Sequence, residues 1–380
     1  MKKVYYWSPC LTNVGTVVST LNSAISLSKY SKKDFEVNLI NVCGEWDNHK
    51  NFFLLNNVKI IDLGFKYFNW LPKEGFLSSR ISYLIIFFLS FIPLLILLKK
   101  NKPDYIIIHL ISSLPLFLLN FFNFNTKFIL RISGFPKLTF IRKFLWKISS
   151  KKIFLVTSPT YQLINQLEKI KLFEKSKLTF LPDAIINMKI FVKKNKPDNL
   201  IDTKKISKNF FIAAGRLTRQ KNFHYLINEF NEFLKFNQSY NLLIFGKGEL
   251  EKSLVSSIKK KKLSDKVFLM GHTENLYYYI KKSEAFILSS LWEAPGFVLI
   301  EAAMCNSYII SSDCDNGPYE FLNSGSSGTL FKSNKKNALN DALINFYKNK
   351  SNLTDKKIMS KKNCKKYTMF RHNKYLIKLL

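Results

Sequence analysis

Cysteine is scarce in this sequence and does not form a recognisable framework. The five cysteines are odd in number, and none stands at the spacing of metal ligands: Cys10, Cys43, Cys305, Cys314 and Cys364. This pattern argues against a zinc site. Residues 1–10 lead directly into an apolar strand, without the pattern of a signal peptide, so we expect a reducing, cytoplasmic compartment.

Acidic residues are also few. The 380 residues contain 26 acidic and 59 basic side chains, a net charge of +33. Such an excess raises the question of polyanionic partners, which include nucleic acid, acidic lipid and phosphorylated substrates. A compositional bias of the genome explains the lysines equally well, because they are scattered in short runs rather than gathered in one stripe.

Two series of strand-like segments alternate with helical ones along the chain. Their apolarity is continuous rather than alternating, which is typical of parallel sheets covered on both faces. We expect strands at 3–9, 35–42, 103–110, 126–133 and 152–158, with the segment 177–185 at the end of this first series, and then strands at 210–215, 241–246, 266–271, 284–290 and 307–313. The pattern predicts two doubly wound Rossmann-like α/β domains that face a ligand cleft.

The length and a polar stretch at 192–209 suggest where these domains divide. We expect a first domain over residues 1–190 and a second domain over 206–355. Residues 356–380 have a basic, helical pattern, and we expect them to cross back to the first domain.

One apolar segment, residues 81–98, carries no charge and is followed by Lys99 and Lys100. Its 18 residues are at the lower edge of transmembrane length, and Ser82, Ser90 and Pro93 interrupt it. Three interpretations stay open: a buried helix of the first domain, an amphipathic helix in the membrane plane, and a true span.

Two cationic side chains, Arg216 and Lys221, follow the strand that ends at Gly215. At the carboxyl edge of a sheet they could converge on a diphosphate. In so lysine-rich a chain, two cations in one loop also occur by chance.

Two carboxylates stand eight positions apart in the segment 285–306. Glu293 lies in a loop, and Glu301 lies in an otherwise apolar helix, where a carboxylate is costly unless it meets hydroxyls or a cation. The backbone amides of Gly296, Phe297 and Val298 would form the N-terminus of this helix, which favours a phosphate. Alternatively, Glu293 caps the helix and Glu301 pairs with a lysine.

In combination, these segments resemble the large retaining glycosyltransferase family of the GT-B fold that is often called family 4. The resemblance runs over nearly the whole chain and is strongest over 210–331. It rests on the following motifs in order: KPDYIIIH (102–109), GRLTRQKNF (215–223), IFGKGELE (244–251), VFLMGHTENL (267–276) and SLWEAPGFVLIEAAMCN (290–306). SSDCDNGPYEFL (311–322) is similar to a loop of the branch that builds lipid-linked and surface polysaccharides.

The resemblance implies that the domain at 1–190 binds the acceptor and the domain at 206–355 binds the nucleotide-sugar, and it implies a role for each matching residue. Glu293 would bind hydroxyls of the donor sugar and Glu301 the ribose, while Arg216 and Lys221 would neutralise the diphosphate. The backbone of Gly296, Phe297 and Val298 would also contact the donor, and Gly246 and the segment Met270–His272 would flank the nucleoside. The loop Asn13–Thr16 matches a glycine loop near the phosphates through Gly15, its one glycine where the family has two.

One position departs from the family's pattern. Many members carry a His-Gly pair whose histidine approaches the donor sugar, where this sequence has Ser133-Gly134. His109 lies in another strand, where a lone histidine is more often structural, so its role stays open.

From this resemblance we expect a retaining enzyme that moves a hexose or N-acetylhexosamine from a UDP- or GDP-sugar to a glycan acceptor. The attack would come from the face of the leaving group, whose phosphate assists deprotonation. We expect no cofactor and no metal, because we find no Asp-x-Asp pair to hold one, and Arg216 and Lys221 would stabilise the leaving diphosphate instead.

The basic charge and the apolar segment suggest a polyprenyl-diphosphate-linked acceptor on an acidic membrane. The enzyme would then be peripheral on the cytoplasmic face of a bacterial inner membrane, in surface polysaccharide synthesis. Two alternatives are a GT-B epimerase acting on a nucleotide-sugar, which needs further acid–base residues, and a nucleic-acid-binding protein. The second lacks an aromatic-basic recognition motif.

Overall fold

The structure is a computed structural model that describes residues 1–11, 15–50, 53, 56–72, 76–196, 207–350 and 353–380. The chain folds as two compact units. Unit 1 comprises Met1–Ile185 together with Tyr367–Leu380, and unit 2 comprises Ile186–Lys366. These limits differ from the boundaries at 190, 206 and 355 that we expected from composition.

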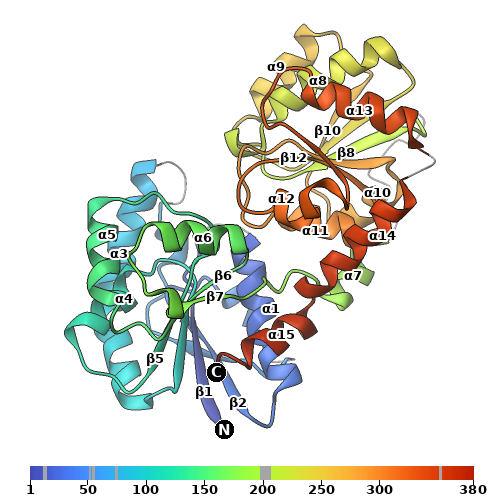
Figure 1. Cartoon of the computed structure of the whole chain (residues 1–380). Helices are drawn as coiled ribbons and strands as arrows, with labels where there is room; N and C mark the ends of the chain where they lie inside the picture. Colours follow the sequence, from blue (N-terminus) through green and yellow to red (C-terminus); the bar gives the residue numbers. More distant parts are fainter. Residues whose placement is uncertain (12–14, 51–52, 54–55, 73–75, 197–206, 351–352) are drawn as a thin grey trace. The chain divides into compact units, whose positions relative to one another are not determined.

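Unit 1 is a seven-stranded parallel sheet with helices on both faces (Figure 1). Its strands are β1 (Lys2–Trp7), β2 (Phe35–Asn41), β3 (Lys59–Asp62), β4 (Tyr105–Ile108), β5 (Lys127–Arg131), β6 (Leu155–Ser158) and β7 (Leu178–Phe180). Its α-helices are α1 (Gly15–Tyr30), α3 (Phe76–Asn101), α4 (Ser113–Phe121), α5 (Phe140–Ser149), α6 (Tyr161–Lys169) and α15 (Met369–Leu376). The strand order is β3-β2-β1-β4-β5-β6-β7.

These strands form from uninterrupted runs of apolar residues, as the sequence predicts. All four residues of β4 are buried, and β1 lies between β2 and β4 in parallel register. Strand β3 was not expected, because it is four residues long and both of its ends are exposed at the edge of the sheet. The apolar run 106–122 divides into β4 and α4.

The two faces of this sheet carry separate cores. Trp7, Ile106 and Ile108 pack with residues of α3 and α4, whereas Tyr6 and Ile107 pack with α1 and α15. Helix α15 is therefore part of the core of unit 1, whereas α14 (Thr354–Asn363) belongs to unit 2. The C-terminal segment is not a single helix, because α14 ends before a 3-10 turn (Cys364–Tyr367) and α15 begins after it.

The apolar segment 81–98 forms most of α3, which is the crossover between β3 and β4. Among the described residues this is the one helix long and apolar enough to cross a membrane, with a mean hydropathy of 2.7 in Arg80–Asn101 and 28% of its apolar window buried. Ile86, Leu94 and Leu98 lie in the core against the sheet. One face of α3 packs on the sheet whose strands it connects, an arrangement that favours a helix lying along unit 1 over a span.

Unit 2 is a six-stranded parallel sheet in the order β10-β9-β8-β11-β12-β13. Its strands are β8 (Phe210–Ala214), β9 (Asn241–Phe245), β10 (Val267–Gly271), β11 (Ala285–Leu288), β12 (Tyr308–Ser312) and β13 (Thr329–Phe331). Its α-helices are α7 (Met188–Lys193), α8 (Phe223–Phe236), α9 (Glu251–Lys260), α10 (Leu276–Lys282), α11 (Phe297–Met304), α12 (Pro318–Phe321), α13 (Ala338–Lys348) and α14. Strand β13 was not expected, because it is only three residues long and follows a glycine-rich loop.

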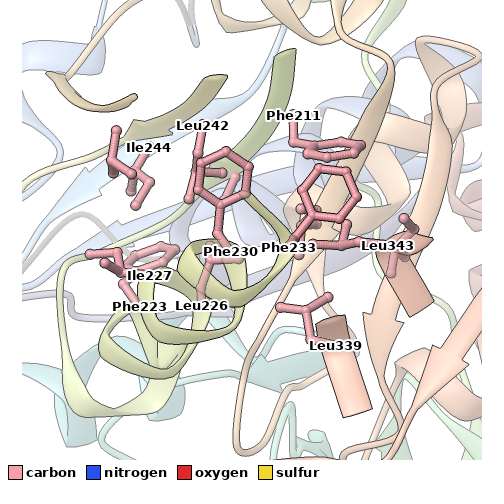
Figure 2. Close-up of a cluster of buried hydrophobic side chains, with 14 of the residues drawn as sticks. Phe211, Phe223, Leu226, Ile227, Phe230, Phe233, Leu242, Ile244, Leu339 and Leu343 are labelled. Atoms are coloured by element: carbon pink, nitrogen blue, oxygen red, sulfur yellow. The ribbon is translucent and has the colours of Figure 1, made fainter. Parts of the chain in front are cut away.

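An aromatic core holds α8 to this sheet. Figure 2 shows Phe230 and Phe233 of α8 pointing towards Phe211 of β8, with Leu339 and Leu343 of α13 beside them. The six apolar residues expected to line one face of this helix are all buried: Phe223, Leu226, Ile227, Phe230, Phe233 and Leu234. Their spacing therefore predicts the buried face of α8 correctly.

Candidate donor site

The sheet of unit 2 changes winding direction at β8. This strand pairs with β9 on one side and β11 on the other, so the chain leaves β8 in one direction and returns to its other edge at β11. Ligands of open α/β sheets bind outside the carboxyl ends of the strands at such a switch point. The predicted cations follow β8, and Glu293 follows β11.

The loops that follow β8 and β9 are interlocked through glycines. Gly215 and Gly246 have φ values of +154° and +138°, and the amide of Gly246 donates to Gly271 O at 2.7 Å. A Cβ on Gly246 would lie 1.9 Å from Gly215 O, and one on Gly248 would lie 2.5 Å from Leu217 O. The glycines thus allow backbone to pack on backbone where Arg216 and Lys221 begin.

Lys221 and Glu293 form a largely buried ion pair. Lys221 Nζ donates to Glu293 Oε1 at 2.5 Å, and the two side chains are 13% and 6% exposed. Ser290 Oγ donates to the same oxygen at 2.5 Å. Loop contacts hold this geometry, since Leu291 N donates to Gln220 O and Ser289 Oγ to Lys221 O. From the sequence we assigned Lys221 to the diphosphate of the donor and Glu293 to its sugar, and the structure shows that the two side chains are paired.

The N-terminus of α11 lies next to this pair. Gly296 precedes the helix at φ +95°, and no side chain caps it. The alternative that Glu293 caps α11 is wrong, because its carboxylate accepts from Lys221 and Ser290 instead. The eight-residue helix therefore begins without a side-chain anion, which suits phosphate binding by the Phe297 and Val298 amides.

Glu301 is oriented by a tyrosine that sequence reasoning missed. Tyr277 OH of α10 donates to Glu301 Oε1 at 2.6 Å, and burial, followed by the charge of Glu301, raises the pKa of Tyr277. The Tyr277 ring lies 5.4 Å from that of Phe191 between centroids. The sequence did predict that a carboxylate in this apolar helix meets a hydroxyl group, but it did not identify Tyr277 as the residue that supplies it. The alternative, in which Glu301 pairs with a lysine, is not observed among the described residues.

Replacing Tyr277 with phenylalanine is expected to weaken UDP or GDP binding about tenfold while the fold is retained. The ring still packs on Phe191, but Glu301 loses a charge-assisted hydrogen bond of about 1.5–3 kcal/mol that fixes its rotamer. Calorimetric titration measures this, and steady-state kinetics should show the donor KM rising more than kcat falls. Tyr278→Phe in the same helix is the matched control, and equal affinities in the two variants would contradict the role.

The remaining predicted residues lie at scattered positions. Arg216 is exposed and makes no ion pair within the described part of the chain. Met270 is half-buried at the end of β10. Gly15 lies in unit 1 as the first residue of α1, and Asn13 and Val14 lie outside the described residues.

An Asp-x-Asp sequence does occur, at Asp313–Cys314–Asp315 after β12, so our statement that no such pair exists is wrong. Asp313 accepts from Ser333 N at 2.8 Å and pairs with Lys332 at 3.2 Å. Asp315 O accepts from Glu293 N at 3.1 Å. These contacts tie the loop after β12 to the rest of unit 2, and metal independence stays a prediction.

In unit 1, His109 stacks on Tyr6 at 6.0 Å between ring centroids. Neither ring nitrogen has a hydrogen-bond partner among the described residues, and neither has the hydroxyl of Ser133. Burial, followed by the charges of Arg131 and His372, holds the pKa of His109 well below its usual value, so the ring is neutral. Its role stays open.

Comparison with known protein families shows what unit 2 is similar to. Residues 193–367, which nearly coincide with unit 2, match the model of the family described as Glycosyl transferases group 1. Unit 2 is thus similar in sequence to the group 1 glycosyl transferases. With two parallel-sheet α/β units and GT-B neighbours among solved structures, the fold class predicted from the sequence is confirmed.

Individual relatives cover the chain unevenly. An uncharacterized glycosyltransferase of Methanocaldococcus jannaschii is 32% identical over 245 residues, which cover 60% of this chain and 59% of the relative. The N-acetylgalactosamine-N,N'-diacetylbacillosaminyl-diphospho-undecaprenol 4-alpha-N-acetylgalactosaminyltransferase of Campylobacter jejuni is 30% identical over 151 residues, 37% of this chain and 40% of the relative. The chain thus aligns with less than two thirds of either curated relative.

A solved structure is similar over the whole chain. Anabaena HepE in complex with UDP and glucose has a TM-score of 0.73 at 11% identity, and the match covers 100% of this chain and 99% of HepE. At this identity the likeness establishes the fold.

Proposed function

We propose that the protein is a retaining glycosyltransferase that moves a hexose or N-acetylhexosamine from a UDP- or GDP-sugar to a lipid-linked glycan acceptor. The observation that carries this proposal is the Lys221–Glu293 pair at the switch point of unit 2, beside the uncapped N-terminus of α11. We call Arg216, Lys221, Glu293, Gly296 and Glu301 the candidate donor site.

The chemistry requires a nucleoside diphosphate to leave an anomeric carbon. Negative charge develops on the leaving oxygens, so fixed cations and helix-end amides give the largest stabilisation. Lys221 is held by one hydrogen bond to Glu293 and keeps two further N–H donors for a diphosphate. Arg216 is exposed at the same loop and can add a bidentate contact. No metal is needed in this scheme.

Glu293 has a double role in this proposal. One oxygen, Oε1, accepts from both Lys221 and Ser290, which leaves Oε2 for a hydroxyl of the donor sugar. The carboxylate thus positions the cation for the diphosphate and fixes the sugar next to it. Glu301, oriented by Tyr277, binds the ribose, and the backbone at Gly246 and Met270 flanks the nucleoside.

The acceptor and location are proposed on chemical grounds. The name of the Campylobacter jejuni relative states a diphospho-undecaprenol substrate for that protein. A net charge of +33 suits a diphosphate-linked acceptor at an acidic lipid surface. We place the enzyme on the cytoplasmic face of a bacterial inner membrane, in the synthesis of a surface polysaccharide.

Thermal unfolding with added ligands tests the proposed donor class against nucleic-acid binding. We expect UDP or GDP to stabilise the protein by about 2.7 kcal/mol at a hundred times its Kd, a shift of several degrees. A single-stranded oligonucleotide of equal phosphate concentration is the control. Stabilisation by the oligonucleotide and by neither nucleotide would overturn the proposal.

A further inference from the structure

Two polar residues of helix α3 point inward. Ser82 and Ser90 are buried, and their hydroxyls bond to Pro72 O at 2.6 Å and to Tyr67 OH at 3.4 Å. Large apolar side chains face outward instead: Leu84 is 58% exposed, Phe88 71%, Ile92 57% and Ile96 57%. A helix on the surface of a water-soluble domain has apolar residues on its core side and polar residues outside, whereas α3 has apolar residues on both sides, because Ile86, Leu94 and Leu98 also pack in the core. The outer face of α3 is therefore built for an apolar environment.

Helix α5 extends this apolar face. Phe140, Ile141 and Phe144 are 84%, 77% and 57% exposed. Within unit 1, α5 packs on α4 and α4 packs on α3, and Figure 1 shows the three helices along one side of the sheet. Burial lowers the pKa of Arg142 on α5, and Tyr83 and Arg80 on α3 add smaller electrostatic effects, which places the N-terminal part of α3 near the start of α5. We call the exposed residues of α3 and α5 the α3–α5 face.

The chain around this face is almost free of acidic residues. Over residues 75–167 the acidic residue is Asp104, and Arg131 is buried in an ion pair with Asp183. The other basic residues number eleven: Arg80, Lys99, Lys100, Lys102, Lys127, Lys137, Arg142, Lys143, Lys147, Lys151 and Lys152. Lys143 and Lys147 are exposed on α5 itself, and Lys99 and Lys100 are exposed at the end of α3. Apolar side chains rimmed by cations match a membrane interface, where acyl chains lie beneath acidic headgroups.

The same charges argue against a second copy of the chain as the occupant. A symmetric dimer through the α3–α5 face would bring identical basic surfaces together, and like charges across an interface are repulsive. A membrane that contains acidic lipid supplies the missing negative charge. Because the inner side of α3 packs in the core of unit 1, the helix can enter one leaflet only from its exposed side.

We propose that the α3–α5 face docks unit 1 on an acidic phospholipid membrane, with Phe88 and Phe140 inserted between headgroups and acyl chains. The proposal rests on the proposed function in placing the enzyme at a membrane. Vesicle binding, however, is measured without donor or acceptor, so its failure and the failure of sugar transfer are separate results.

Flotation with vesicles tests this surface. The full chain is mixed with phosphatidylcholine vesicles that contain or lack phosphatidylglycerol. We expect the wild type to float with the acidic vesicles, and the Phe88→Gln, Phe140→Gln double variant to lose affinity by about a hundredfold, since each buried aromatic side chain contributes roughly tenfold or more. Phe236→Gln, at a residue of unit 2 that is 45% exposed, is the matched control and should bind as the wild type does.

A charge variant makes the test independent of the aromatic substitutions. Lys143→Glu with Lys147→Glu should weaken binding to acidic vesicles roughly tenfold or more, as should raised salt, whereas Lys259→Glu with Lys260→Glu on α9 should not. Circular dichroism checks that each variant is folded. Equal flotation of all variants, or no flotation of the wild type, would overturn the proposal. So would a wild-type dimer that the Phe88→Gln, Phe140→Gln variant converts to monomers.

Discussion

Lys221→Ala is expected to lower sugar transfer about 100- to 1,000-fold, which is the usual effect of removing one preorganised donor to a developing anion. The cation stands at the switch point of unit 2, where its Nζ lies 2.5 Å from Glu293 Oε1. Release of the nucleoside diphosphate from a panel of UDP- and GDP-sugars measures the change. Lys252→Ala, at an exposed lysine of α9, is the control, and unimpaired turnover of Lys221→Ala would contradict the assignment.

A stability measurement separates this chemical role from a structural one. Lys221→Ala leaves Glu293, 6% exposed, without its cation, and breaking a buried pair in this way costs about 3–5 kcal/mol. Adding Glu293→Gln removes the stranded charge, so the double variant should recover much of the lost stability. It should not recover activity. Recovery of both would mean that the pair supports the fold alone.

Gly246→Ala is expected to destabilise unit 2 by about 3 kcal/mol or more and to abolish nucleotide binding. The new Cβ would lie 1.9 Å from Gly215 O, a backbone atom that cannot move without displacing the loop that carries Arg216. A φ of +138° adds strain for any residue with a side chain. Hydrogen exchange in peptides that cover β8 and β9 during urea unfolding measures the change.

Gly271→Ala is the matched control for this prediction. Gly271 also has a positive φ, +66°, in the same sheet, but its Cβ would meet nothing within 4 Å. It should therefore cost about 1 kcal/mol, from backbone strain alone. Equal destabilisation by the two substitutions would show that the close approach of Gly246 to Gly215 has no energetic consequence.

Local apolarity predicted most of the fold, and two of the edge strands, β3 and β13, were the exception. Central strands such as β8 and β9 are buried over all five residues, so their apolar runs are continuous. Strand β3 (KIID) has exposed ends, and β13 is three residues long, so neither has a pattern that differs from a loop. Their pairing with β2 and β12 decides their structure.

The sequence predicted which residues belong to the candidate donor site, but it did not predict the contacts between them. Lys221 and Glu293 were both expected at the carboxyl edge of the sheet, but their pairing depends on β8 and β11 being neighbours, which the sequence does not state. Tyr277 meets Glu301 across two helices 24 residues apart, so no local pattern identifies it. The buried face of α3 had a signal, since Ser82 and Ser90 are eight residues apart and fall on one side of a helix.

The central claim is that unit 2 binds the diphosphate of a nucleotide-sugar through the loop after β8. Titration calorimetry of UDP and GDP against the wild type and Arg216→Ala tests this most directly, because Arg216 is exposed and its removal leaves no buried charge behind. We predict binding of one nucleotide per chain and a loss of affinity of about tenfold or more in Arg216→Ala, from one charge-assisted contact. Equal affinity of the two proteins, or no binding of either nucleotide to the wild type, would contradict the claim.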